Sequence, residues 1–209
     1  MEIDSERQKR MLGAIVSTVV AHVTELTDLD RAIGDGDHGV NLQRGVKAIA
    51  QQLDEFAALP LGQALHDVGK RLVMTVGGAS GPLYGTLFMV LGKHLADTEL
   101  SRDSIVAACE AAVAAVKARG KSDVGQKTLL DVLVPVELEL RTGSGDMLER
   151  LPETARSAAT ATIGMVAKRG RAAFLRERSV GHMDPGARSS QLMIAAVCES
   201  LQRGAESSS

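Results

Sequence analysis

The chain of 209 residues has very few aromatic side chains, with no Trp, one Tyr and three Phe. Strands favour aromatic and β-branched residues, whereas Ala, Leu, Glu, Lys, Arg and Met, which are plentiful here, favour helices. The scarcity of aromatics therefore predicts an all-α protein. The length suits one domain with a sizeable core, so we expect residues 1–209 to form a single domain.

Other absences exclude whole classes of protein. Cys109 and Cys198 are the only two cysteines, and both lie in apolar helical patterns, so no disulfide framework is indicated. No apolar run approaches the ~18 residues that a membrane span needs, and the charged N-terminus, MEIDSERQKR, lacks the apolar core of a signal peptide. A net charge of −2 and a pI near 6.2 offer no basic surface for nucleic acid. We therefore expect a cytoplasmic protein that binds neither membranes nor nucleic acid.

Apolar residues recur at three- and four-residue steps along most of the chain, which is the period of a helix that buries one face. The pattern predicts eight helices with short connections, and this arrangement favours an antiparallel up-and-down barrel or bundle. The expected ranges are 5–26, 39–58, 61–76, 82 to about 92, 101–120, 127–141, 147–168 and 191–201, with a disordered tail over about 203–209.

In such a topology, alternate loops lie at the same end of the barrel. The loops after the first, third, fifth and seventh helices are the ones rich in glycine or charge, so we expect them to form a functional site at one rim. They contain residues 29–41, 77–85, 119–131 and 176–190.

The first of these loops, LDRAIGDGDHGVN, carries the carboxylates of Asp30, Asp35 and Asp37 among three glycines. Glycines let the chain fold back and aim carboxylates at one point, where they repel one another unless a cation neutralises them. Magnesium fits because it needs few protein carboxylates and completes its shell with water and phosphates. An EF-hand is excluded, since Val46 stands where the bidentate Glu is required. A solvated turn is the alternative.

The segment GGASGPLYG, residues 77–85, has the ingredients of an anion-binding loop: glycine N–H groups, the Ser80 hydroxyl and a helix N-terminus. It is not a Walker A loop, because no Gly-Lys-Ser/Thr follows, and a tight turn between helices is the alternative. In the last rim segment Arg178 could reach a phosphate, or be a solvated charge. Gly120 and Leu129 could be an ordinary helix cap and an ordinary core residue.

Four motifs, AIGDGDHGVN, GGASGPLYGTLF, KTLLDVLVP and GHMDPGARSS, occur in this order and together resemble the nucleotide-binding L subunit of dihydroxyacetone kinase, over about residues 5–201. The resemblance implies an eight-helix barrel with a nucleotide, ADP or ATP, and two magnesium ions at its rim. It implies that Asp30, Asp35 and Asp37 are the metal ligands and that Arg178 and His38 are catalytic. The implied nucleotide contacts are His38, Gly39, Val40, Asn41, Gly78, Ala79, Ser80, Gly120, Leu129, Arg178, Asp184, Pro185 and Gly186. Two departures are Leu129, where the family commonly has Met, and Gln126, where an acidic residue is expected.

The chain length resembles the branch that depends on the phosphotransferase system, in which ADP stays bound as a cofactor. There a phosphohistidine-carrying M subunit recharges ADP to ATP, and the γ-phosphoryl group passes to dihydroxyacetone on a substrate-binding K subunit. The alternatives are an L-type subunit of an ATP-using kinase for another small sugar or ketose, a fatty acid kinase domain, and a non-catalytic nucleotide-sensing partner. His38 after GDGD speaks against the fatty acid kinase. A transcription regulator and a second copy of the chain stay open as further partners.

Overall fold

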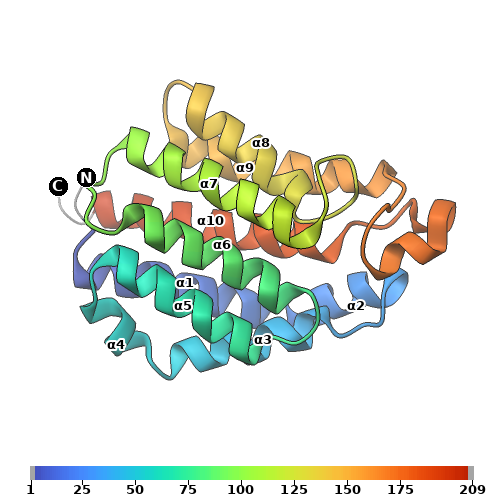
Figure 1. The fold of residues 1–209 in the computed structure, drawn as a ribbon, viewed down its shortest axis with the longest axis horizontal. Helices are drawn as coiled ribbons and strands as arrows, with labels where there is room; N and C mark the ends of the chain where they lie inside the picture. Colours follow the sequence, from blue (N-terminus) through green and yellow to red (C-terminus); the bar gives the residue numbers. More distant parts are fainter. Residues whose placement is uncertain (1–2, 207–209) are drawn as a thin grey trace.

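All regular structure in residues 3–206, the part of the chain that the computed structural model describes, is helical, which confirms the predicted all-α class (Figure 1). Ten α-helices and two 3₁₀-helices occur in these residues. They are α1 (Ser5–Ala21), α2 (Val23–Ile33), α3 (His38–Ala50), α4 (Leu53–Ala58), α5 (Leu61–Thr75), α6 (Ser80–Leu95), α7 (Arg102–Gly120), α8 (Leu130–Thr142), α9 (Met147–Ala161), η1 (Thr162–Gly164), η2 (Arg171–Ser179) and α10 (Pro185–Glu206).

The helices pack in a cyclic order. From α5 to α10 each α-helix contacts the next, and α10 returns to α1, which contacts α3, which in turn contacts α5. Figure 1 shows the helices lying roughly along the long axis of the molecule, and α1 begins at the same end at which α10 finishes. The largest cluster of buried apolar side chains joins these helices except α9 and includes Leu26, Val68, Val116 and Leu130, whereas α9 packs through a second cluster that contains Leu151 and Ala155.

Two of the eight predicted helices are each divided into two. His22 separates α1 from α2 with a bend of 57°, and Gln51 and Gln52 separate α3 from α4. Because α2 continues to Ile33, Asp30 lies in a helix and not in a loop as predicted. The acidic loop is therefore only four residues long, Gly34–Asp37.

Two helices on the rim side begin away from the predicted residues. Helix α6 begins at Ser80, two residues before Pro82, and Ala79 is its N-cap. Helix α8 begins at Leu130 and not at Lys127. Lys127 has a φ of 61°, and this left-handed backbone cannot continue a right-handed helix.

The last two long helices also differ from the expectation. Helix α9 ends at Ala161, where the chain passes into the 3₁₀-helix η1, well before the predicted end at Lys168. Helix α10 begins at Pro185, because proline suits the first turn of a helix, and not at Gln191. It is helical through Glu206, so it extends into the segment predicted as a disordered tail, whose last residues, 207–209, lie outside the described part.

The sequence predicted neither a disulfide framework nor a membrane-spanning segment, and the structure can be compared with both predictions. Cys109 and Cys198 are both free thiols, as predicted. Within residues 3–206 no single helix has the length and apolar character to cross a membrane, and α1 and α2 meet that criterion only when counted together across their bend.

Candidate functional site at one end of the helix ring

Four segments meet at one end of the ring, the right-hand end in Figure 1. They are the α2–α3 loop, the α5–α6 loop, the α7–α8 loop and the segment from η1 to the start of α10. Side chains tie them together: Arg171 Nη2 lies 2.9 Å from Asp35 Oδ2, and His38 Nδ1 lies 3.0 Å from Ser80 Oγ. The four loops rich in glycine or charge therefore share one rim, as their order in the chain predicts.

The three aspartates of the first loop converge. Asp30, Asp35 and Asp37 each offer a carboxylate oxygen, and these oxygens lie within 4.8 Å of one another. Asp30 is buried, and its Oδ2 accepts the backbone N–H groups of Asp37, at 2.8 Å, and His38, at 3.1 Å. Three carboxylate oxygens suit magnesium, which binds a few protein oxygens and keeps water and phosphate as its other ligands. The donor set therefore fits the predicted metal.

Two glycines let the acidic loop take this shape. Gly36 has a φ of +76°, a left-handed conformation that glycine adopts without steric cost. Gly39 lies in the first turn of α3, where an added Cβ would come within 2.2 Å of the Val23 carbonyl oxygen. The start of α3 can therefore approach α2 closely enough for its amide groups to bond Asp30.

His38 is buried between three helices. It is 8% exposed, its Nδ1 lies 3.0 Å from Ser80 Oγ on α6, and its Nε2 lies 2.9 Å from Ser189 Oγ on α10. Burial lowers the pKa of His38 to about 4, against the opposing effect of the Asp30 and Asp37 carboxylates. The ring is therefore neutral near pH 7, with one nitrogen donating and the other accepting. Its implied catalytic role stays a prediction.

The α5–α6 loop folds around the side chain of Asn41, which is buried on α3. An added Cβ at Gly77 would lie 2.6 Å from Asn41 Oδ1, and Gly78 has a φ of +65°. The N-cap of α6, Ala79, makes no side-chain hydrogen bond to the first turn. The first N–H groups of α6, beginning at Ser80, are therefore not capped by that side chain, as an anion-binding loop requires.

The predicted nucleotide contacts from the other two loops also meet. An added Cβ at Gly186 would lie 3.0 Å from Asp184 Oδ2 and 3.4 Å from the backbone nitrogen of Leu129. Leu129 is 6% exposed and belongs to the main core. Asp184 is also buried, and its Oδ2 accepts the N–H of Ala187 at 2.7 Å, so it caps α10, which begins at Pro185. Burial raises the pKa of Asp184 to about 7, although this hydrogen bond opposes the shift.

Gly120, the last residue of α7, lies close to the first turn of α6, since an added Cβ there would lie 3.3 Å from Leu83 Cδ2. Two predicted site residues stand apart from these contacts. Val40 is 47% exposed on α3. Arg178 is exposed near the end of η2, and its side chain makes no hydrogen bond or ion pair within residues 3–206. The arginine that pairs with the acidic triad is instead Arg171, through Asp35.

Lys127 is a site-adjacent residue that sequence reasoning missed. Its side chain is buried, and its Nζ donates to the carbonyl oxygens of Thr162 at 2.8 Å, Met165 at 3.1 Å, Ser179 at 2.8 Å and His182 at 2.6 Å. Burial lowers its pKa, and the Asp184 carboxylate opposes the shift. A lysine within the motif KTLLD was the available signal, but its acceptors lie far away in the chain.

Tyr84 is the second residue of this kind. Its hydroxyl lies 3.0 Å from the Gly186 carbonyl oxygen, 2.7 Å from Ser189 Oγ and 2.9 Å from Ser190 Oγ. Burial raises its pKa to about 12. This sole tyrosine of the chain therefore locks α6 to the start of α10, and its place in the glycine-rich motif was the signal that could have found it.

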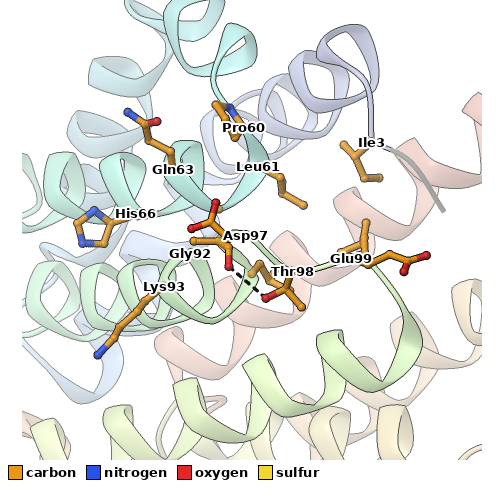
Figure 2. A pocket seen from close by; sticks show the side chains of 14 residues that line it. Ile3, Pro60, Leu61, Gln63, His66, Gly92, Lys93, Asp97, Thr98 and Glu99 are labelled. Atoms are coloured by element: carbon orange, nitrogen blue, oxygen red, sulfur yellow. Dashed lines mark hydrogen bonds between the residues drawn. The ribbon is translucent and has the colours of Figure 1, made fainter.

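A cavity of about 950 Å³ lies at the other end of the ring, between the start of α5 and the α6–α7 connection (Figure 2). Its lining includes Pro60, His66, Lys93 and Asp97. None of the predicted site residues lines it, so this cavity does not coincide with the converging motifs.

Comparison with known proteins agrees with the geometry of the rim. The sequence matches the DAK2 domain family over residues 32–199. The ADP-binding subunit DhaL of the phosphoenolpyruvate-dependent dihydroxyacetone kinase of Escherichia coli is 42% identical over 176 residues, which cover 81% of this chain and 84% of that protein. The corresponding DhaL subunit of kinase 1 of Listeria innocua is 37% identical over 199 residues, which cover 95% of this chain and 98% of that protein.

A solved structure shares the fold. The crystal structure of the dihydroxyacetone kinase of C. freundii in complex with AMP-PNP and Mg²⁺ matches with a TM-score of 0.75 at 26% identity, over 92% of this chain and 33% of that chain. The family match and the two curated relatives together cover all four motifs of the rim. The chain therefore belongs to the DAK2 domain family and, within it, to the DhaL-type subunits whose length it nearly matches.

Proposed function

We propose that this chain is the ADP/ATP-binding subunit of a phosphoenolpyruvate-dependent dihydroxyacetone kinase. It passes the γ-phosphoryl group of magnesium-bound ATP to dihydroxyacetone held on a K subunit, and a phosphohistidine-carrying M subunit converts the ADP back into ATP. The observation that carries this proposal is the convergence of three carboxylate oxygens within 4.8 Å beside an uncapped helix N-terminus. Its support is the similarity to ADP-binding subunits with this activity.

The acidic triad serves the metal. Asp30, Asp35 and Asp37 would hold the magnesium ions, two by the family resemblance, and bound magnesium would neutralise the phosphate charge that opposes transfer. Asp30 is preorganised for this role, because two backbone N–H groups fix its carboxylate before any ion binds. Preorganised groups do not need to reorient when charge develops during the reaction.

The anionic part of the nucleotide would face the start of α6 and the arginines of η2. N–H groups at a helix N-terminus point toward an anion and carry the positive end of the helix dipole. Arg178 is exposed and makes no ion pair within residues 3–206, so its guanidinium is available to a phosphoryl group that crosses the rim. A guanidinium can bridge two phosphate oxygens, which stabilises the charge of the transferring group.

Exposed apolar side chains around the rim support transfer to a second protein. The exposed fractions are 47% for Val40, 77% for Met74, 47% for Val124, 87% for Phe174 and 41% for Val180. All five lie in the segments that form the rim or in the adjoining helix turns. Apolar side chains gathered beside a polar site mark a surface that another protein covers, and we assign this surface to the K and M subunits, with all three proteins in the cytoplasm.

The test of the metal site combines substitution with nucleotide retention. Asp30→Asn, Asp35→Asn and Asp37→Asn should each lose ADP and magnesium in native mass spectra while far-ultraviolet circular dichroism stays unchanged. Asp123→Asn is the matched control, because Asp123 is an exposed rim carboxylate that pairs with Lys117 outside the triad. Ligand at 100 times its Kd stabilises a fold by about 2.7 kcal/mol, so EDTA should lower the melting temperature by several degrees.

Two results would contradict the proposal at different points. If EDTA changes neither the melting temperature nor the ADP content, the triad is not the metal site. If ADP is retained but triose phosphorylation fails with K and M subunits in excess, the chain binds nucleotide without transferring the phosphoryl group. Turnover in that coupled assay, lost in all three aspartate variants, is the expected result.

A further inference from the structure

Lys127 stands out among the cations of this protein by its burial. It is 1% exposed, and no other Lys or Arg in residues 3–206 is buried. Its backbone has a φ of 61°, which a non-glycine residue adopts only at a cost. A buried ammonium group also loses its hydration, so the surroundings must provide strong compensation. Backbone strain and the loss of hydration therefore occur at the same residue, which indicates that the ammonium group has a specific structural role.

The compensation is a cage of backbone oxygens. Four carbonyl groups, those of Thr162, Met165, Ser179 and His182, lie between 2.6 and 3.1 Å from Nζ. An ammonium has three N–H donors, so all of them are satisfied and one is shared between two acceptors. All four carbonyls belong to residues 162–182, which we call the strap. Lys127 therefore gathers the two ends of the strap onto the α7–α8 loop.

The strap carries the cationic groups of the rim. Arg171 pairs with Asp35 of the acidic triad at 2.9 Å, and Arg178 follows seven residues later in the same 3₁₀ segment, beyond the non-helical backbone of Arg176. Beyond its end the chain reaches Asp184, which caps α10. Apolar attachment of the strap is slight, because only Ala167, Ala172 and the partly buried Leu175 pack against Ile33 in its apolar cluster.

We propose that Lys127 is a positioning residue of the nucleotide site: by collecting the strap carbonyls it fixes Arg171 and Arg178 relative to the acidic triad. It acts through the strap and touches neither the triad nor the anion-binding loop. The link to nucleotide binding rests on the proposed function, whereas the effect on the strap itself does not. The charge of the side chain is essential here, since a neutral group of the same size leaves the carbonyl oxygens without donors.

The test replaces the lysine and then adds a small amine to the solution to restore the missing ammonium group. In Lys127→Ala, amide hydrogen exchange should lose protection over 162–182 by about tenfold or more, the effect of losing hydrogen bonds to a charged group, while exchange in α1, α5 and α10 stays unchanged. Affinity for ADP in the presence of magnesium should fall by roughly the same factor. Lys121→Ala is the matched control, because Lys121 is exposed in the same loop and also has a positive φ. It should change neither quantity.

Propylammonium supplies the atoms that Lys127→Ala lacks, and propan-1-ol supplies the same shape without the charge. The cation should restore strap protection and ADP affinity, and the alcohol should not. Equal rescue by both compounds, or unchanged exchange in Lys127→Ala, overturns the proposal. Lost strap protection with unchanged ADP affinity would refute the positioning role alone. If Lys127→Ala does not fold, Lys127→Met, which keeps the apolar stem, serves for the same exchange and ADP measurements, with the same outcomes deciding.

Discussion

Replacing Asp184 with Asn should change the resistance to urea in a way that depends on pH. The stability of the variant relative to the unaltered chain should be greater at pH 8 than at pH 5. Asp184 is buried at the start of α10, and burial raises its pKa from 3.8 to about 7. The folded state therefore holds a proton on this carboxyl over a pH range in which the unfolded chain has released it. The contribution of Asp184 to stability is fully present below pH 3.8 and is lost as the pH rises toward about 7.

The size of the effect follows from the same shift. One pKa unit corresponds to about 1.4 kcal/mol, and integration over both titrations gives a loss on the order of 2–3 kcal/mol between pH 5 and pH 8. Asn has no proton to release, and its Oδ1 can still accept the N–H of Ala187. The difference in unfolding free energy between Asp184→Asn and the unaltered protein should therefore grow by this amount across the range.

Urea titrations at several pH values, followed by circular dichroism, measure that difference directly. Asp146→Asn is the matched control, because Asp146 caps the Leu148 N–H at the start of α9 but is exposed. Its substitution should give a difference that does not grow with pH. A flat difference for Asp184→Asn would show that the buried carboxyl is ionised throughout and that the reasoning from burial is wrong.

Four further substitutions have defined outcomes. Arg178→Lys should keep ADP but lower phosphoryl transfer by roughly 10³, because lysine lacks the planar fork, and near-normal turnover in the coupled triose assay would make Arg178 a surface charge. Ser80→Ala should weaken ADP binding by only about 1 kcal/mol, since one hydroxyl is lost, whereas Gly78→Val should weaken it far more, because a β-branched residue is strained at a φ of +65°. If calorimetry shows equal, small effects of both substitutions on ADP affinity, the loop is a tight turn between helices and not an anion-binding loop. Tyr84→Phe should cost about 1–2 kcal/mol in urea unfolding, because the hydroxyl has three buried partners, and an unchanged midpoint would contradict those bonds.

The helices and the shared rim were predictable because they depend on local pattern and on simple topology. Apolar spacing places most of the helices within a few residues, and alternate loops of an up-and-down arrangement must lie at one end. The convergence of Asp30, Asp35 and Asp37 follows from their spacing among glycines. The break at His22 was not predictable in this way, because the apolar stripe continues across it. Asp30 was expected in a loop because it belongs to the stretch rich in aspartate and glycine over 29–41, whereas α2 continues to Ile33.

The cations of the rim show where sequence reasoning ends. Arg171 and Arg178 lie in one arginine-rich segment, and nothing local indicates that Arg171 pairs with the triad. Lys127 was expected at the start of a helix, whereas it lies in a loop and its acceptors are 35 to 55 residues away. Both assignments depend on how the segment 162–182 folds back, and the 3₁₀ turns and left-handed residues of that segment have no periodic signal.

The hydroxyl of Ser80 has a single proton, and this limits what the neighbouring groups can do at the same moment. If the hydroxyl donates to His38 Nδ1, then Nε2 carries the ring proton and donates to Ser189. If the hydroxyl turns to donate to a phosphate oxygen, the ring keeps its hydrogen bond to Ser80 only as the other tautomer, with the proton on Nδ1. Ser189 must then donate to Nε2, and it gives up the acceptor that it would otherwise bond, which is the Gly186 carbonyl oxygen or the Tyr84 hydroxyl. The chain Ser80–His38–Ser189–Tyr84 thus has a direction, and the direction reverses with the partner that Ser80 serves.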